Sequence, residues 1–122
     1  MSNILIPWAD PFLGKEELSH ILESFKNQRF TSGQKVKEFE KLMAKYLNVK
    51  YAIAVSNGTV ALDIALKTLK IGIGDEVIVP SMTYISSASS VSYQNAIPVF
   101  VDIDKKTFNI DVKSLEKAIS KK

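Results

Sequence analysis

Between residues 51 and 118, short apolar segments alternate with segments that have a helical pattern. The apolar segments read "YAIAV" at 51–55, "DEVIVP" at 75–80 and "IPVFVDI" at 97–103. Continuous apolar runs of this length suit strands that are buried on both faces of a sheet. Three strands that alternate with helices predict a parallel sheet with helical crossovers, which is an α/β fold.

Helices are expected after each of these runs. "TVALDIALKTLKIG" at 59–72 predicts a helix that ends at Gly72. "TYISSASSVSYQN" at 83–95 predicts a second helix with small residues over much of its surface. Asp111 is expected to cap a third helix near the C-terminus.

The first 50 residues have a different pattern, which predicts two amphipathic helices. In the segment 15–26, apolar residues recur at the helical positions i, i+3, i+4 and i+7. These residues are Leu18, Ile21, Leu22 and Phe25. The segment 34–47 repeats the pattern, and "TSG" at 31–33 fits a helix-capping turn between the two helices.

Composition narrows the class of protein. Apolar residues make up 46% and charged residues 24% of the 122 residues, which is ordinary for a globular protein. A net charge of +3 is too small for a nucleic-acid-binding face. No apolar run reaches the roughly 18 residues of a membrane span, and no signal peptide is recognised, so we expect a cytoplasmic protein. Cysteine is absent and His20 is the single histidine, so we expect no metal site.

The carboxyl ends of the expected strands are the places to look for a ligand, because open parallel sheets bind ligands there. This rule selects "SNGT" at 56–59, "PSMTY" at 80–84 and "VDID" at 101–104. In "SNGT", Gly58 lets an anion approach the backbone at the start of a helix, and Thr59 adds a hydroxyl donor. A plain N-cap turn explains "SNGT" equally well.

The other two stretches have structural readings as well. Tyr84 either packs on the core or stacks on a planar ligand, and packing is favoured when the residue is taken alone. Asp102 and Asp104 form an acidic pair, but no third ligand is nearby. We therefore interpret both acids as turn or capping residues.

Taken together, the motifs resemble the DegT/DnrJ/EryC1/StrS family of pyridoxal-phosphate-dependent sugar-nucleotide aminotransferases. The ordered series is "TSG" with "V..FE", then "SNGT.AL..AL", "G.GDEVIVPS.TY" and "PVFVDID". The resemblance implies one incomplete domain over 1–122. Its segment 1–50 is helical, and its segment 51–122 begins the large α/β domain of the aspartate-aminotransferase fold, also called PLP fold type I.

The resemblance also gives roles to particular residues. It implies that Gly58 and Thr59 bind the phosphate of pyridoxal 5'-phosphate and that Tyr84 stacks on its pyridine ring. It implies that Thr31, Ser32 and Gly33 lie at the active-site entrance and dimer interface, where the substrate is contacted. The partners implied are a sugar nucleotide, an amino-acid donor such as glutamate, and a second copy of the protein.

This chain departs from the family pattern by its length, since family members are about three times longer. The lysine that holds the cofactor as a Schiff base lies beyond residue 122 in the family, so no catalytic residue is assigned and the chain alone is expected to be inactive. The sheet is expected to be incomplete, with the strands either repacked side by side or covered by association. Two alternatives remain open: a sugar dehydratase of the same family, and a non-catalytic α/β module that binds phosphate or only associates.

Overall fold

The computed structural model describes residues 9, 11–27, 31 and 33–120 of the chain. The chain divides into two compact units, 1–54 and 55–122. Each unit is described by itself. Within the described residues, none of the helices combines the length and hydrophobicity that crossing a bilayer requires.

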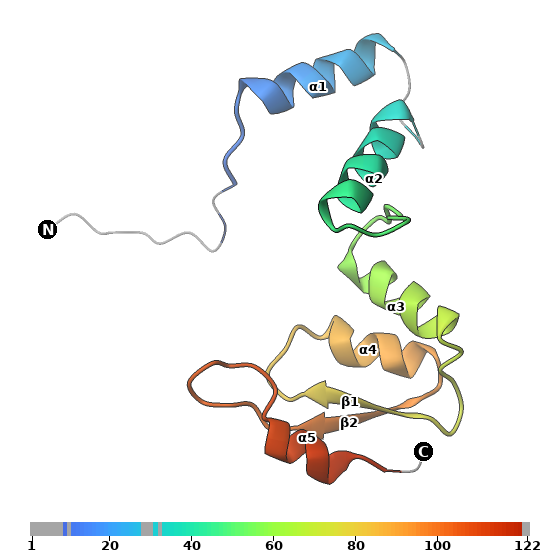
Figure 1. The fold of residues 1–122 in the computed structure, drawn as a ribbon, viewed down its shortest axis with the longest axis vertical. Helices are drawn as coiled ribbons and strands as arrows, with labels where there is room; N and C mark the ends of the chain where they lie inside the picture. The colour runs from blue at the N-terminus through green and yellow to red at the C-terminus, as the bar shows by residue number, and fades with distance from the viewer. Residues whose placement is uncertain (1–8, 10, 28–30, 32, 121–122) are drawn as a thin grey trace, which may run out of the picture. The chain divides into compact units, whose positions relative to one another are not determined.

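The first unit contains the two helices that the apolar periodicity predicted. These are α1 (Lys15–Lys26) and α2 (Gln34–Tyr46), drawn in blue and teal in Figure 1. At the start of α1, the amide of Gly14 donates to the Glu17 carboxylate at 2.7 Å, which satisfies one of the free donors of a helix N-terminus. The apolar face of α1 is not covered, since Leu18, Ile21 and Leu22 are 55%, 52% and 51% exposed.

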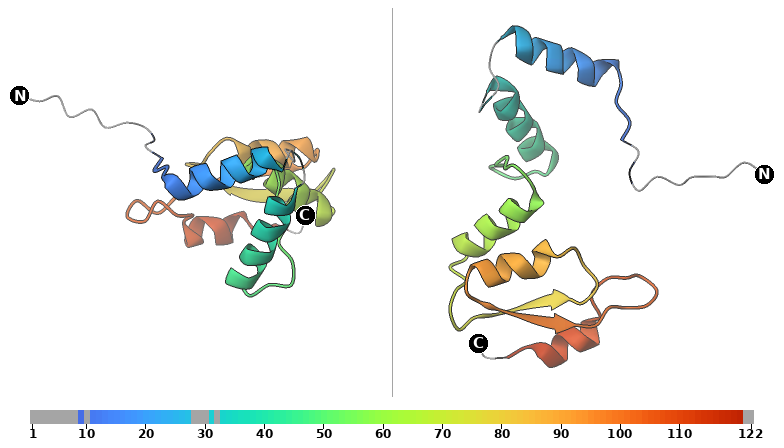
Figure 2. Two further views of the ribbon diagram at one scale, coloured as in Figure 1. Left: turned by 90° about the horizontal axis from the view of Figure 1, so that it is seen from above. Right: turned by 180° about the vertical axis from the view of Figure 1, so that it is seen from behind.

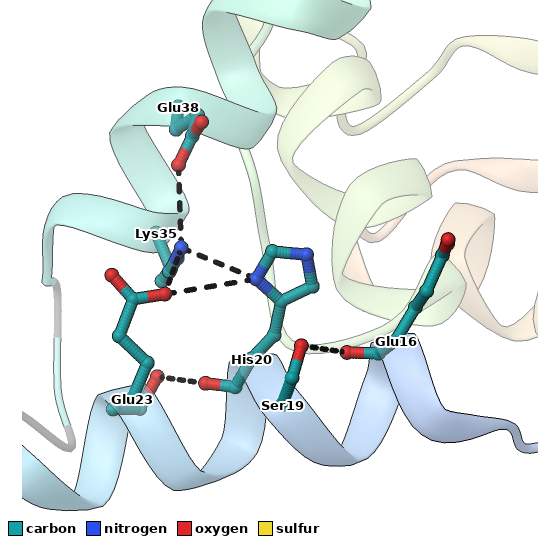
Figure 3. Close-up of polar contacts among 7 residues, drawn as sticks. Glu16, Ser19, His20, Glu23, Lys35 and Glu38 are labelled. Atoms are coloured by element: carbon teal, nitrogen blue, oxygen red, sulfur yellow. Dashed lines mark hydrogen bonds and ion pairs between the residues drawn. The ribbon is translucent and has the colours of Figure 1, made fainter.

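Polar side chains connect α1 to α2. Lys35 Nζ lies 2.8 Å from the Glu23 carboxylate and 3.3 Å from His20 Nδ1 (Figure 3). These contacts hold the pKa of the Glu23 carboxyl below its usual value and that of Lys35 above it, chiefly through the hydrogen bond between the two groups. All of these side chains are exposed, and exposed ion pairs add little stability.

The second unit holds a small parallel sheet between helices. Its elements are α3 (Gly58–Thr68), β1 (Glu76–Pro80), α4 (Ser86–Tyr93), β2 (Ile97–Val101) and α5 (Val112–Ala118). Strands β1 and β2 pair in parallel, from Glu76 opposite Ile97 to Pro80 opposite Val101. Helix α4 covers one face of the sheet and packs against α3, whereas α5 lies on the other face (Figures 1 and 2).

The core of this unit lies where α4 meets the sheet. Val79 and Val91 are 2% and 1% exposed, and Ala88 and Ala96 are also buried beside them. Three partly buried residues pack against this cluster from α3, from the loop after it and from β1, namely Leu66, Ile71 and Val77. The small residues of α4 therefore allow helix and sheet to approach each other closely.

The prediction of a strand at 51–55 is wrong for this structure. No strand forms there in the described part of the chain, and Tyr51 and Ile53 are 72% and 81% exposed. A strand requires a neighbour with free backbone groups, and β1 and β2 pair with each other instead of with this segment. The amide of Ala54 donates to the Glu40 carboxylate at 2.9 Å rather than to another strand. Side-by-side packing of three strands is therefore wrong for this structure.

The predicted end of α3 is also wrong, because the helix does not extend to Gly72. The helix ends at Thr68, and Lys70 takes the left-handed conformation with φ of 62°. The amide of Ile71 then donates to the Leu66 carbonyl at 3.1 Å, which is the 6→1 bond of a Schellman motif. A lysine stands where glycine or asparagine is usual.

Candidate functional site: a cleft at the start of α3

An open cleft of about 730 Å³ lies between the start of α3 and the start of α4. Its lining consists of Asn57, Gly58, Thr59, Ala61, Leu62, Ala65, Tyr84 and Ser86. The structure thus brings together the three residues that were predicted to bind the cofactor, Gly58, Thr59 and Tyr84. They come from stretches that are separated by more than 20 residues of the sequence.

Asn57 shapes the end of the cleft that favours an anion. Its side-chain oxygen accepts a hydrogen bond from the Val60 amide at 3.0 Å, so Asn57 is the N-cap of α3. In the described part of the chain, the amides of Gly58 and Thr59 donate to no protein group. Two free donors and the positive end of the helix dipole meet here, which is the usual setting for phosphate. The N-cap reading of "SNGT" is thus confirmed, and it is compatible with an anion site.

Gly58 leaves this end of the cleft open. A Cβ built on Gly58 would meet no heavy atom within 4 Å, so no neighbouring protein group requires a glycine here. The backbone at Gly58 does not require a glycine either, because Gly58 does not have a positive φ; among the described glycines, Gly74 does. The space beside Gly58 is therefore available to a ligand.

Tyr84 and three residues of α3 give the rest of the cleft an apolar character. The Tyr84 side chain is 73% exposed, so the expectation that it packs into the core is wrong for this structure. An exposed aromatic ring beside small apolar residues, here Ala61, Leu62 and Ala65, offers a flat surface for a planar group. No charged side chain lines the cleft among the described residues. The arrangement suits a molecule with an anionic group at one end and a flat ring at the other.

The "TSG" stretch belongs to the other unit. Gly33 is the N-cap of α2, and the Lys37 amide donates to its carbonyl at 3.4 Å. Thr31 is exposed, and Ser32 lies outside the described residues. The capping turn expected before the second helix is therefore present at Gly33.

The acidic pair is not part of the cleft. The Asp104 carboxylate accepts hydrogen bonds from the amides of Thr107 and Lys106 at 2.8 and 2.9 Å, which lowers the pKa of its carboxyl. Asp102 accepts from the Ile103 amide at 2.8 Å. The interpretation of both acids as turn residues is confirmed. No group of three residues that could hold a metal is found in the described ranges.

Two polar residues of the cleft, Asn57 and Ser86, had no role assigned from the sequence. The signal for Asn57 was available, because asparagine directly before a helical pattern is a common N-cap. Ser86 gave no such signal. It is one of several serines in α4, and its position in the cleft lining is visible in the folded unit alone.

A model of the DegT/DnrJ/EryC1/StrS aminotransferase family matches residues 11–122. GDP-perosamine synthase from Caulobacter vibrioides is 50% identical over 113 residues, which are 92% of this chain and 30% of that protein. Spore coat polysaccharide biosynthesis protein SpsC from Bacillus subtilis is 42% identical over 118 residues, which are 97% of this chain and 30% of that protein. The solved structure of NtdA from Bacillus subtilis, with bound cofactor PMP, matches with a TM-score of 0.79 and 38% identity, over 85% of this chain and 24% of that one.

The chain belongs to the DegT/DnrJ/EryC1/StrS aminotransferase family. Its expected fold class is confirmed: an α/β fold that corresponds to the N-terminal part of the large domain of PLP fold type I enzymes, with an incomplete sheet of two strands in the described residues. The chain spans about 30% of the length of the two curated relatives described above.

Proposed function

We propose that residues 1–122 are the N-terminal part of a pyridoxal-phosphate-dependent aminotransferase. The complete enzyme transfers an amino group from an amino acid, glutamate, to a keto-sugar nucleotide for polysaccharide or deoxyaminosugar biosynthesis. The observation that carries this proposal is the cleft, in which the free amides of Gly58 and Thr59 and the exposed ring of Tyr84 face one space. Relatives that include a GDP-perosamine synthase and a polysaccharide biosynthesis protein support the substrate class.

The residues present fit pyridoxal phosphate. The N-terminus of α3 supplies donors for a phosphate, and the open space at Gly58 leaves room for it. The apolar wall with Tyr84 suits the pyridine ring. When bound, the cofactor supplies the electron sink for amino-group transfer, and the protein supplies its binding and orientation.

Each named residue has one role in this proposal. The amides of Gly58 and Thr59 hold the phosphate, and Tyr84 orients the ring by stacking. Thr31, Ser32 and Gly33 contact the substrate. No lysine lines the cleft in the described part of the chain, so residues 1–122 alone do not carry out the transfer.

Self-association is also part of the proposal, as a homodimer or a larger assembly. Large apolar side chains are exposed in both units, among them Ile21 and Leu22 of α1 and Phe100 of β2. Exposed apolar surface of this kind is typical of protein interfaces.

The test uses the complete enzyme, meaning the aminotransferase whose N-terminal part is this chain. With ¹⁵N-labelled glutamate and a keto-sugar nucleotide, mass spectrometry should find the label in the sugar product. Replacing Tyr84 with alanine should weaken cofactor binding at least about fivefold, because a well-placed aromatic contact is worth on the order of 1 kcal/mol beyond its area.

Tyr93→Ala is the matched control, because Tyr93 is the last residue of α4, is 67% exposed and does not line the cleft. Failure to transfer the label from any amino donor would contradict the proposed activity. Equal cofactor binding by the Tyr84→Ala and Tyr93→Ala variants would contradict the proposed site.

A further inference from the structure

We infer that Ser86 is a further ligand-binding residue of the cleft and that its hydroxyl hydrogen-bonds to a polar substituent on the ring of the bound cofactor. The inference rests on the proposed function and adds to it a contact from α4. The three residues predicted from the sequence supply backbone amides, one hydroxyl at the α3 end and an aromatic face. Ser86 would supply a polar side chain beside that face.

The first observation is that Ser86 is a buried residue whose hydroxyl has no hydrogen-bond partner among the described residues. The residue is 93% buried, since its exposed fraction is 7%. Within the described residues, no hydrogen bond to the Ser86 hydroxyl is formed. Native structures rarely leave a hydroxyl of a buried residue without any partner, protein or solvent.

The hydroxyl must therefore open onto free space. Every fully buried side-chain nitrogen or oxygen atom in the described part of the chain has a hydrogen-bond partner. The Ser86 hydroxyl has none, so its oxygen is not fully buried and remains reachable. The open space that Ser86 lines is the cleft, beside Tyr84.

Several other helical hydroxyls do form local bonds, and Ser90, which is 1% exposed and forms none among the described residues, does not line this cleft. Ser24 and Thr68 donate to the carbonyl four residues earlier in their helices, at 3.0 and 2.7 Å. Ser92 does the same within α4 at 3.3 Å. Ser87 pairs with the Thr83 hydroxyl at 2.9 Å. A helical serine that makes no such local bond keeps both its donor and its acceptor for something else.

The position of Ser86 favours the ring over the phosphate. The phosphate donors are on α3, at Gly58 and Thr59, whereas Ser86 is on α4, two residues after the ring-stacking Tyr84. The remaining α3 residues of the lining, Ala61, Leu62 and Ala65, have no side-chain polar atoms. Among the residues that line the cleft, Ser86 is thus the polar side chain nearest in sequence to Tyr84, and a hydroxyl can serve either a ring hydroxyl or a ring amine.

The test measures ligand binding to the complete enzyme freed of cofactor, by isothermal titration with pyridoxamine 5'-phosphate, with pyridoxamine and with inorganic phosphate. Ser86→Ala should weaken the binding of both ring compounds about fivefold, the size of one neutral hydrogen bond, and leave phosphate binding unchanged. Ser89→Ala is the control, because Ser89 is on the same helix and does not line the cleft. Thermal unfolding should be similar for the two variants.

The outcomes separate the inference from the proposed function. If the unsubstituted enzyme binds pyridoxamine 5'-phosphate and Ser86→Ala binds it equally well, Ser86 has no role and the proposed function stands. Weaker phosphate binding with unchanged pyridoxamine binding would overturn the assignment to the ring. If the unsubstituted enzyme binds none of the three compounds, both the proposed site and the inference are wrong.

Discussion

Gly58 and Gly74 differ in what they require of a side chain, and this difference gives a test at the residue scale. Alanine at Gly58 meets open space, whereas Gly74 has φ of +92°, where any other residue is strained. We expect Gly74→Ala to lower the free energy of unfolding by about 1 kcal/mol and Gly58→Ala not to lower it. Urea denaturation of the two variants measures this.

The same Gly58→Ala substitution should nevertheless weaken binding of pyridoxamine 5'-phosphate to the complete enzyme, because the added methyl group occupies the space proposed for the phosphate. Gly74→Ala should leave that binding unchanged once the variant is folded. If Gly58→Ala binds pyridoxamine 5'-phosphate as tightly as the unsubstituted enzyme, the phosphate does not bind beside Gly58 at the start of α3.

Two carboxylates make stability depend on pH at the acid end. The Ser114 side chain and amide lower the pKa of the Asp111 carboxyl, and the amides of Thr107 and Lys106 lower that of Asp104, both below the ordinary 3.8. A depressed pKa stabilises the fold above the unfolded value, and this contribution is lost as the pH falls through the folded value. We expect the melting temperature to drop below about pH 4.

Asp111→Asn isolates one of these groups, because asparagine still caps the helix but does not titrate in this range. Its melting temperature should fall less steeply than that of the unsubstituted chain between pH 4 and pH 2. An identical fall in both proteins would show that Asp111 does not contribute to the acid transition.

At the scale of elements, the end of α3 contains a correctable strain. Lys70 holds the left-handed conformation that costs a residue with a side chain about 1 kcal/mol relative to glycine. Lys70→Gly should therefore raise the free energy of unfolding by up to about 1 kcal/mol. Lys67→Gly is the control, since Lys67 lies inside the helix and glycine there should lower stability by about 1 kcal/mol. If both variants are destabilised, the strain assigned to Lys70 is absent.

Local patterns predicted most of the elements. Helical periodicity placed α1 and α2, and the apolar runs placed β1 and β2 within one or two residues. The strand at 51–55 was predicted wrongly because an apolar run indicates that a strand can form but does not show whether a neighbouring strand is available to pair with it. In this structure Glu40 takes the Ala54 amide instead.

The candidate site could be predicted in part from the same local patterns. Gly58, Thr59 and Tyr84 could be proposed from the sequence because they follow predicted strands, at the edge where ligands bind, and match a family motif, and the structure brings them to one cleft. Ser86 was not found, since serines are frequent in α4 and burial is a property of the folded unit. The acids at 102 and 104 were interpreted correctly, because aspartate commonly bonds the backbone just after it.

For the molecule as a whole, the exposed apolar face of α1 predicts association. Replacing Ile21 and Leu22 together with aspartate should reduce the assembly size measured by size exclusion with light scattering, because charge opposes burial of that face. Both residues are half exposed, so folding should persist. Aspartate at Ser19 and Ser24 adds the same charge elsewhere on α1 and should leave the assembly unchanged. A monomer before any substitution would contradict the expectation.

The most direct test of the proposed function is a crystal structure of the complete enzyme with pyridoxamine 5'-phosphate bound. The account predicts phosphate oxygens within about 3 Å of the amide nitrogens of Gly58 and Thr59, with the ring stacked on Tyr84. A phosphate held elsewhere, or a ring distant from Tyr84, would contradict it.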